Sequence, residues 1–190
     1  MMKQTPSQTV GPFFAFGLIR KGENILVSEA TPGNRIRIEG RVFDGAGEPV
    51  PDAMIEIWQA NAYGRYNHPE DKQEKPLDPL FIGFGRAATD EHGAYWFETI
   101  KPGRVPGPAN SLQASHIDII VFARGMLLHA FTRLYFEDEP VNESDPILSQ
   151  IEDKARRATL MARRENSGGI VIYRFDIRLQ GENETVFFDM

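Results

Sequence analysis

The chain has 190 residues, no cysteine and a net charge of −6 from 27 acidic and 21 basic residues. Its 41% hydrophobic content, with thirteen phenylalanines, suits one globular domain with a substantial core. The acidic balance argues against a general nucleic-acid or membrane-surface binder, which would carry a basic stripe or a basic amphipathic helix. The lack of cysteine excludes disulfides, thiolate metal sites and cysteine nucleophiles.

Neither a membrane span nor a signal peptide is predicted. No apolar run approaches the length that a span requires, and the N-terminus lacks a basic region followed by an apolar core. A cytoplasmic location is therefore the expectation.

Residues 1–33 show little periodicity and are predicted to form an extended arm. Thr9, Gly11 and Pro12 belong to a stiff segment of this arm that ends in two phenylalanines. Such a segment is expected to dock, either on the chain's own sheet or on a partner.

Alternating apolar residues predict β-strands through most of the remaining chain. The alternation begins at Arg35 and is clearest over Val171–Gln180. Turn signals recur about every ten residues, which is typical of an all-β sandwich. We expect a single domain over 1–190, with the strands of the sandwich in 35–136 and 171–189. The predicted strands between the first and the last are Met54–Gln59, Ala94–Ile100, Ile117–Ala123 and Leu128–Phe136.

Residues 144–165 are the exception, because their apolar residues recur at roughly helical spacing. Ser144 can cap a helix and Pro146 suits a first turn. This segment is therefore predicted to be a helical insertion, giving one or two peripheral helices. The segment 62–85 reads as a long loop, which in a compact domain is usually functional or part of an interface.

Three side chains could form a metal site. His116 and Asp118 are two residues apart on a predicted strand and so point to one face, and Tyr66 ends a Gly-Arg-Tyr turn. Imidazole, carboxylate and phenolate can all ligate iron. The alternative is a hydrogen-bonded strand histidine, an ordinary polar residue and an aromatic at the edge of the core. The residues alone leave both interpretations open.

Arg133 shares one face of its strand with His129, Phe131 and Tyr135. A guanidinium among aromatic rings can bind the carboxylate of a planar aromatic substrate through two parallel hydrogen bonds. The alternative is a salt-bridged arginine at the edge of a sandwich, and the pattern does not separate the two.

Taken together, these residues resemble the intradiol ring-cleavage dioxygenases. The resemblance implies a β-sandwich fold and a ferric iron held by two tyrosines and two histidines. It also implies insertion of O2 between the two hydroxylated carbons of protocatechuate, which gives 3-carboxy-cis,cis-muconate. It covers nearly the whole chain and rests on Thr5–Phe14, Gly40–Gly47, Glu56–Asn61, Gly64–Tyr66, Ile100–Gly103, Phe122–Gly125, Thr132–Phe136 and Tyr173–Gln180.

The iron ligands of the family fall on Tyr66, Val105, His116 and Asp118. Valine has no donor atom and a carboxylate replaces one imidazole, so these positions are vestigial. An arginine expected before the first histidine is replaced by Gln113. These departures are similar to those of non-iron alpha chains in heteromeric members of the family, so no catalytic residue is expected in this chain alone.

For such a chain the resemblance implies Fe(3+) held by a homologous beta chain, in a higher-order alpha/beta oligomer. The substrate-contacting positions of the family's alpha chains fall on Thr9, Gly11, Pro12 and Arg133. Two other hypotheses stay open. One is a self-sufficient iron enzyme that uses Tyr66, His116 and Asp118. The other is a transthyretin-like β-sandwich that serves as a binding module without a catalytic partner.

Overall fold

A computed structural model describes residues 17–189 and consists mainly of β-strands. Between the strands lie three short 3₁₀ segments and one short α-helix, α2 (Lys154–Ala158). The 3₁₀ segments are Pro108–Asn110, Pro140–Ser144 and Leu148–Gln150. The strands are β1 (Arg35–Phe43), β2 (Met54–Trp58), β3 (Phe84–Ala88), β4 (Ala94–Ile100), β5 (His116–Phe122), β6 (Ala130–Phe136), β7 (Met161–Ser167), β8 (Ile170–Arg174) and β9 (Ile177–Arg178).

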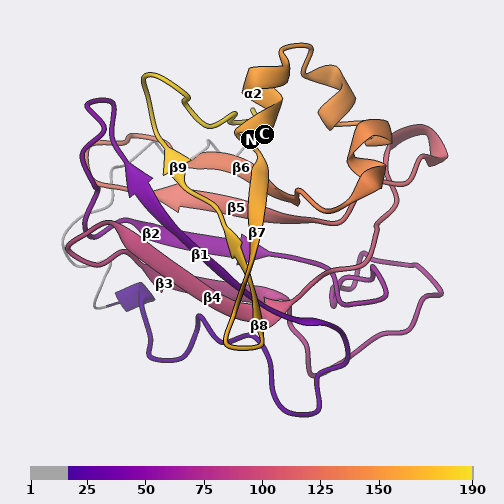
Figure 1. Ribbon diagram of the computed structural model, residues 1–190. Helices are drawn as coiled ribbons and strands as arrows, with labels where there is room; N and C mark the ends of the chain where they lie inside the picture. The colour runs from indigo at the N-terminus through magenta and orange to yellow at the C-terminus, as the bar shows by residue number, and fades with distance from the viewer. Residues whose placement is uncertain (1–16, 190) are drawn as a thin grey trace, which may run out of the picture.

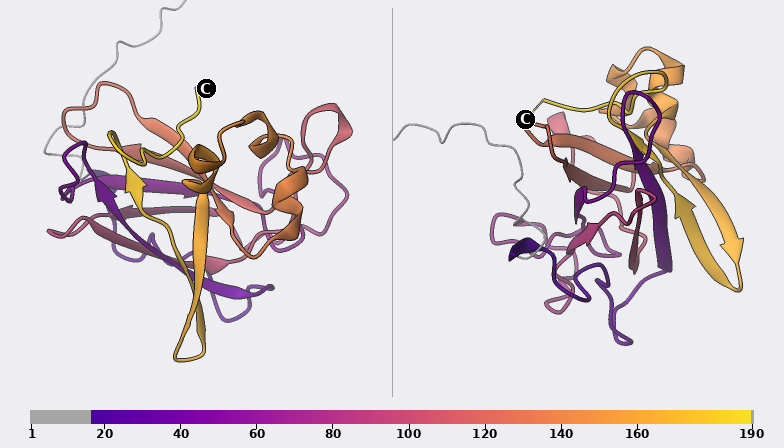
Figure 2. Two further views of the ribbon diagram at one scale, coloured as in Figure 1. Left: turned by 45° about the horizontal axis from the view of Figure 1, so that its top comes forward. Right: turned by 90° about the vertical axis from the view of Figure 1, so that its left-hand side faces the viewer.

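The strands follow one hydrogen-bonded path in the order β3-β2-β5-β6-β7-β8-β1-β4, and β9 pairs with β1. Most neighbours are antiparallel, whereas β6 with β7 and β1 with β8 and β9 are parallel. The path folds back on itself, so that the β2 and β5 region faces the β1 and β4 region (Figures 1 and 2). The predicted all-β sandwich is confirmed.

The core lies between these two layers. On β1, alternate residues Ile36, Ile38 and Val42 are buried and meet Phe97 of β4 and residues of β2, β5 and β6 in one cluster. Full burial of such a side chain contributes about 1.5–3 kcal/mol. Gly40 occupies the same face because a Cβ there would lie 1.8 Å from the carbonyl oxygen of Phe175.

The two ends of the sheet path are joined by a short segment, 23–26, that precedes β1. The Arg86 N–H of β3 donates to the Glu23 carbonyl, while the Glu98 N–H of β4 donates to the Asn24 carbonyl. The Leu26 N–H in turn donates to the Glu98 carbonyl. This segment therefore pairs with both edge strands.

The predicted helical insertion over 144–165 is wrong from Met161 onward. Only α2 is an α-helix, and from Met161 onward the chain forms β7. Capping also differs, since the Asp153 side chain accepts hydrogen bonds from two N–H groups at the start of α2. The single strand predicted over Val171–Gln180 is divided into β8 and β9. No helix within 17–189 is long and apolar enough to cross a membrane.

Candidate functional site

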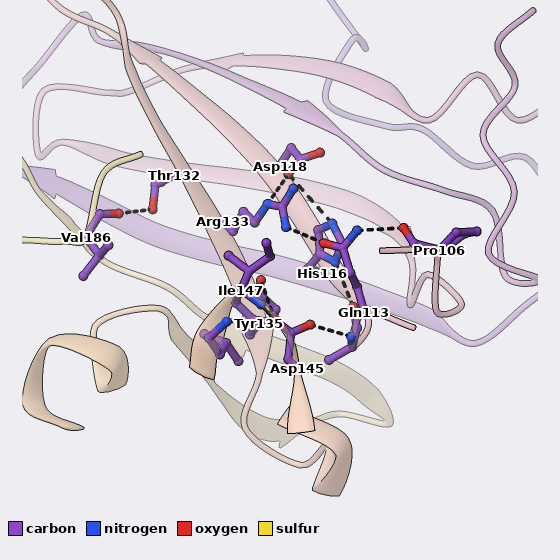
Figure 3. Close-up of polar contacts among 12 residues, drawn as sticks. Pro106, Gln113, His116, Asp118, Thr132, Arg133, Tyr135, Asp145, Ile147 and Val186 are labelled. Carbon is purple, nitrogen blue, oxygen red and sulfur yellow. Dashed lines mark hydrogen bonds and ion pairs between the residues drawn. The ribbon is translucent and has the colours of Figure 1, made fainter. Parts of the chain in front are cut away.

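The candidate site lies on β5 and β6, where cross-strand pairing brings four polar side chains together (Figure 3). His116 pairs with Tyr135 and Asp118 pairs with Arg133 in the antiparallel register. Residues two apart on a strand share a face, so all four project to one side of the sheet. The arrangement follows from the register of this strand pair.

Asp118 and Arg133 form an ion pair that is largely shielded from solvent. Arg133 Nε lies 2.9 Å from Asp118 Oδ1, and the two side chains are 18% and 17% exposed. Arg133 Nη1 also donates to Gln113 Oε1 at 2.7 Å, and the Gln113 amide donates to the Pro106 carbonyl at 2.8 Å. The guanidinium is thus engaged inside its own chain, as the salt-bridge interpretation of the sequence anticipated.

His116 is almost fully buried, with its side chain 2% exposed. Its Nδ1 lies 2.8 Å from the Ala114 carbonyl oxygen, which can only accept, so Nδ1 carries the proton. Nε2 has no hydrogen-bond partner and lies 3.9 Å from Asp118 Oδ1. Burial lowers the pKa of His116 below its ordinary value, which the nearby Asp118 opposes, and the ring is therefore neutral near pH 7.

Tyr66 reaches the same site from the loop after β2. Its ring stacks on Trp58, with centroids 5.8 Å apart, and its N–H donates to Asp71 Oδ2 at 2.7 Å. Burial raises the pKa of the Tyr66 phenol well above its ordinary value, and the Asp118 charge adds to this. The phenol is therefore neutral. The turn before Tyr66 requires glycine at position 64. Gly64 has φ +79, and a Cβ there would lie 1.9 Å from the Arg104 carbonyl oxygen.

Val105 follows the Lys-Pro-Gly corner and is buried against the site, where it offers only methyl groups. The corner is held by Lys75, whose ammonium donates to the Arg104 carbonyl at 2.6 Å. Tyr66, Val105, His116, Gln113 and Arg133 line a cavity of about 780 Å³ together with Trp58.

Asp145 was not anticipated from the sequence, although it organises one side of the site. It is fully buried and accepts hydrogen bonds from the N–H groups of Ala114, Ile147 and Leu148 at 2.7–2.9 Å. The Tyr135 hydroxyl donates to it at 3.4 Å. An aspartate directly before a proline is a recognised turn signal, and here it ties the 3₁₀ segments to the start of β5.

These residues do not fit a ferric ion. Val105 has no donor atom, and the Asp118 carboxylate already faces the Arg133 cation. Among residues 17–189, no three histidine, aspartate or glutamate side chains gather in a way that could hold a metal.

The structure brings together Tyr66, Val105, His116 and Asp118, the four predicted vestigial positions, and places Arg133 among them. The predicted contacts at Thr9, Gly11 and Pro12 lie outside the described residues. The substrate-binding role of Arg133 stays a prediction. The contribution of Trp58, which supports the Tyr66 ring, was missed, since stacking of strand and loop residues leaves no signal in sequence spacing.

The chain is similar in sequence to known dioxygenases. A model of the Dioxygenase family matches residues 10–181. The chain is 42% identical to the protocatechuate 3,4-dioxygenase alpha chain of Pseudomonas putida, covering 100% of this chain and 98% of that one. It is 40% identical to the protocatechuate 3,4-dioxygenase beta chain of Burkholderia cepacia, over 80% of this chain and 67% of the relative.

Among solved structures, the chain is similar to the dioxygenase domain of a carbohydrate-binding fusion protein from Streptomyces sp. SirexAA-E. The TM-score is 0.63 at 27% identity, covering 94% of this chain and 99% of that domain. Fold and sequence thus agree over almost the whole length. The chain belongs to the intradiol dioxygenase family.

Proposed function

We propose that this chain is the alpha subunit of a heteromeric protocatechuate 3,4-dioxygenase, in which a homologous beta chain holds the ferric iron. The assembled enzyme would cleave protocatechuate between its hydroxylated carbons with O2, giving 3-carboxy-cis,cis-muconate. On its own the chain would be inactive.

One observation carries this proposal: the chain resembles a named alpha chain along its full length, while its own ligand positions cannot seat iron. The 42% identity extends over the whole chain. Yet a valine and an ion-paired aspartate stand at two of the four ligand positions. A family member that keeps the fold but lacks the donors can take part in ring cleavage only with a metal that another chain holds.

The partner's iron would supply the binding and activation of the catecholate. The contribution proposed for this chain is to shape the substrate pocket through Thr9, Gly11, Pro12 and Arg133. A proline and a glycine make a stiff wall that limits the poses of a substrate, and a guanidinium can bind its carboxylate. For Arg133 this requires that the guanidinium rearrange from its ion pair with Asp118 when the enzyme assembles.

The test is to purify the chain alone and after co-expression with a beta chain, and to measure iron content and O2 uptake with protocatechuate. We expect no iron and no activity from the lone chain. With the beta chain, iron, ring cleavage and co-purification should appear together.

Two outcomes would favour the other hypotheses. Stoichiometric ferric iron in the lone chain, with a visible phenolate-to-iron band, would indicate a self-sufficient site of Tyr66, His116 and Asp118. Failure to co-purify with any beta chain, with no gain of ring cleavage, would indicate a binding module.

A further inference from the structure

Two buried acceptor atoms, His116 Nε2 and Asp118 Oδ1, face each other in the site. The two atoms are 3.9 Å apart; within the described residues Nε2 has no hydrogen-bond partner, and Oδ1 has its ion pair with Arg133 Nε. Because Nδ1 of His116 is committed to the Ala114 carbonyl, Nε2 presents a lone pair. The gap can accommodate one metal ion with bonds of about 2.1 Å to each atom. Tyr66 and His116 line one cavity, so Tyr66 stands on the same side of the site.

A permanent positive charge stands beside this gap. Arg133 Nε lies 2.9 Å from the same Asp118 oxygen, so a metal bound to that oxygen would lie within about 5 Å of the guanidinium. A guanidinium does not lose its proton in proteins, so the repulsion would persist at every working pH. In a largely shielded site such a repulsion is much stronger than in water.

The guanidinium is also held in place. The β5–β6 register sets Arg133 opposite Asp118, and Gln113 accepts from its Nη1 while donating to the Pro106 carbonyl. Turning Arg133 away would leave Asp118 as an uncompensated, mostly buried charge, which is strongly unfavourable.

We propose that the fixed positive charge of Arg133 prevents a metal ion from binding at a latent site formed by Tyr66, His116 and Asp118. On this account the loss of ligands is only part of the reason that the chain cannot hold a metal, and a fixed charge supplies the rest. The inference concerns the isolated chain and does not depend on its role as an alpha subunit.

The test uses Co(II), whose bound form has visible absorption, titrated into the purified full chain. Arg133→Gln removes the charge while keeping a polar side chain of similar reach. It should bind one Co(II) per chain at least tenfold more tightly than the unmodified protein. Arg133→Lys, which keeps the charge, should behave like the unmodified protein. His116→Gln added to Arg133→Gln should abolish the gain, which would locate the ion at this site.

A second pair of variants avoids leaving Asp118 unpaired, in case Arg133→Gln folds poorly. Asp118→His and the double variant Asp118→His/Arg133→Gln offer the same imidazole and phenol donors and differ in the charge at position 133. The double variant should bind Co(II) at least tenfold more tightly. Equal affinity within this pair, tight binding by the unmodified chain, or a gain in Arg133→Lys as large as in Arg133→Gln would each overturn the proposal.

Discussion

Arg133 stands directly opposite Asp118 across β5 and β6, and its Nε is 2.9 Å from the carboxylate oxygen. Both side chains are more than four-fifths buried by this arrangement. Each charge therefore depends on the other for its compensation.

Removing both charges of the Asp118–Arg133 pair should destabilise the chain by less than the sum of the two single removals. Asp118→Asn and Arg133→Gln are each expected to lower the free energy of unfolding by about 2–4 kcal/mol, because each leaves a buried charge unpaired. The double variant should lose less than the sum, with a coupling of about 1–3 kcal/mol in urea titrations. Additive losses would mean that the pair is effectively solvated.

Asp145→Asn should lower the free energy of unfolding by about 2–4 kcal/mol, since the charged oxygens accept from three backbone N–H groups in a fully buried position. The matched control is Asp153→Asn, at the exposed start of α2, where asparagine caps nearly as well and the loss should stay below about 0.5 kcal/mol. Similar losses at the two positions, measured by urea unfolding, would contradict the organising role of Asp145.

His116 should contribute to the pH dependence of the free energy of unfolding. Burial lowers its folded pKa, so below the unfolded pKa of about 6.5 the unfolded chain takes up the proton first. Stability should therefore fall as pH drops below about 6.5, until the folded pKa is reached. His116→Gln should flatten this part of the curve, whereas His92→Gln, at an exposed turn, should leave it unchanged. A drop that persists in His116→Gln would assign the effect to other groups.

In the assembled enzyme, Arg133→Ala should raise the KM for protocatechuate by about 10–100-fold with kcat largely kept, if its guanidinium binds the substrate carboxylate. Arg163→Ala, on the exposed part of β7, is the control and should leave KM unchanged. An unchanged KM in Arg133→Ala, with lowered thermal stability, would confine Arg133 to its ion pair with Asp118.

The strands that cross the core could be predicted from the sequence because one face of each strand is buried and the other is more exposed. Alternation over β1 and β4 follows directly from one face being buried and the other less so. β7 lacks that signal, since Arg163–Ser167 are exposed and show no alternation. A different signal was present, because Gly168-Gly169 is typical of a hairpin turn. Both glycines have positive φ and form the tight turn from β7 into β8.

The residues of the site could be predicted from the sequence, but the contacts between them could not. The sequence identifies Tyr66, His116, Asp118 and Arg133 as candidates, but which of them touch depends on the β5–β6 register. A register is set by packing and turns over the whole sheet, so the Asp118–Arg133 contact could not be derived from local spacing.

The segment 23–26 has a consequence for solubility. It occupies backbone groups on the outer sides of both β3 and β4, the two ends of the sheet path. Exposed edge strands are templates onto which a foreign strand can add, and fibrous aggregation proceeds by that route. These four residues, which lie outside the named strands, therefore hinder the addition of a foreign strand to both β3 and β4.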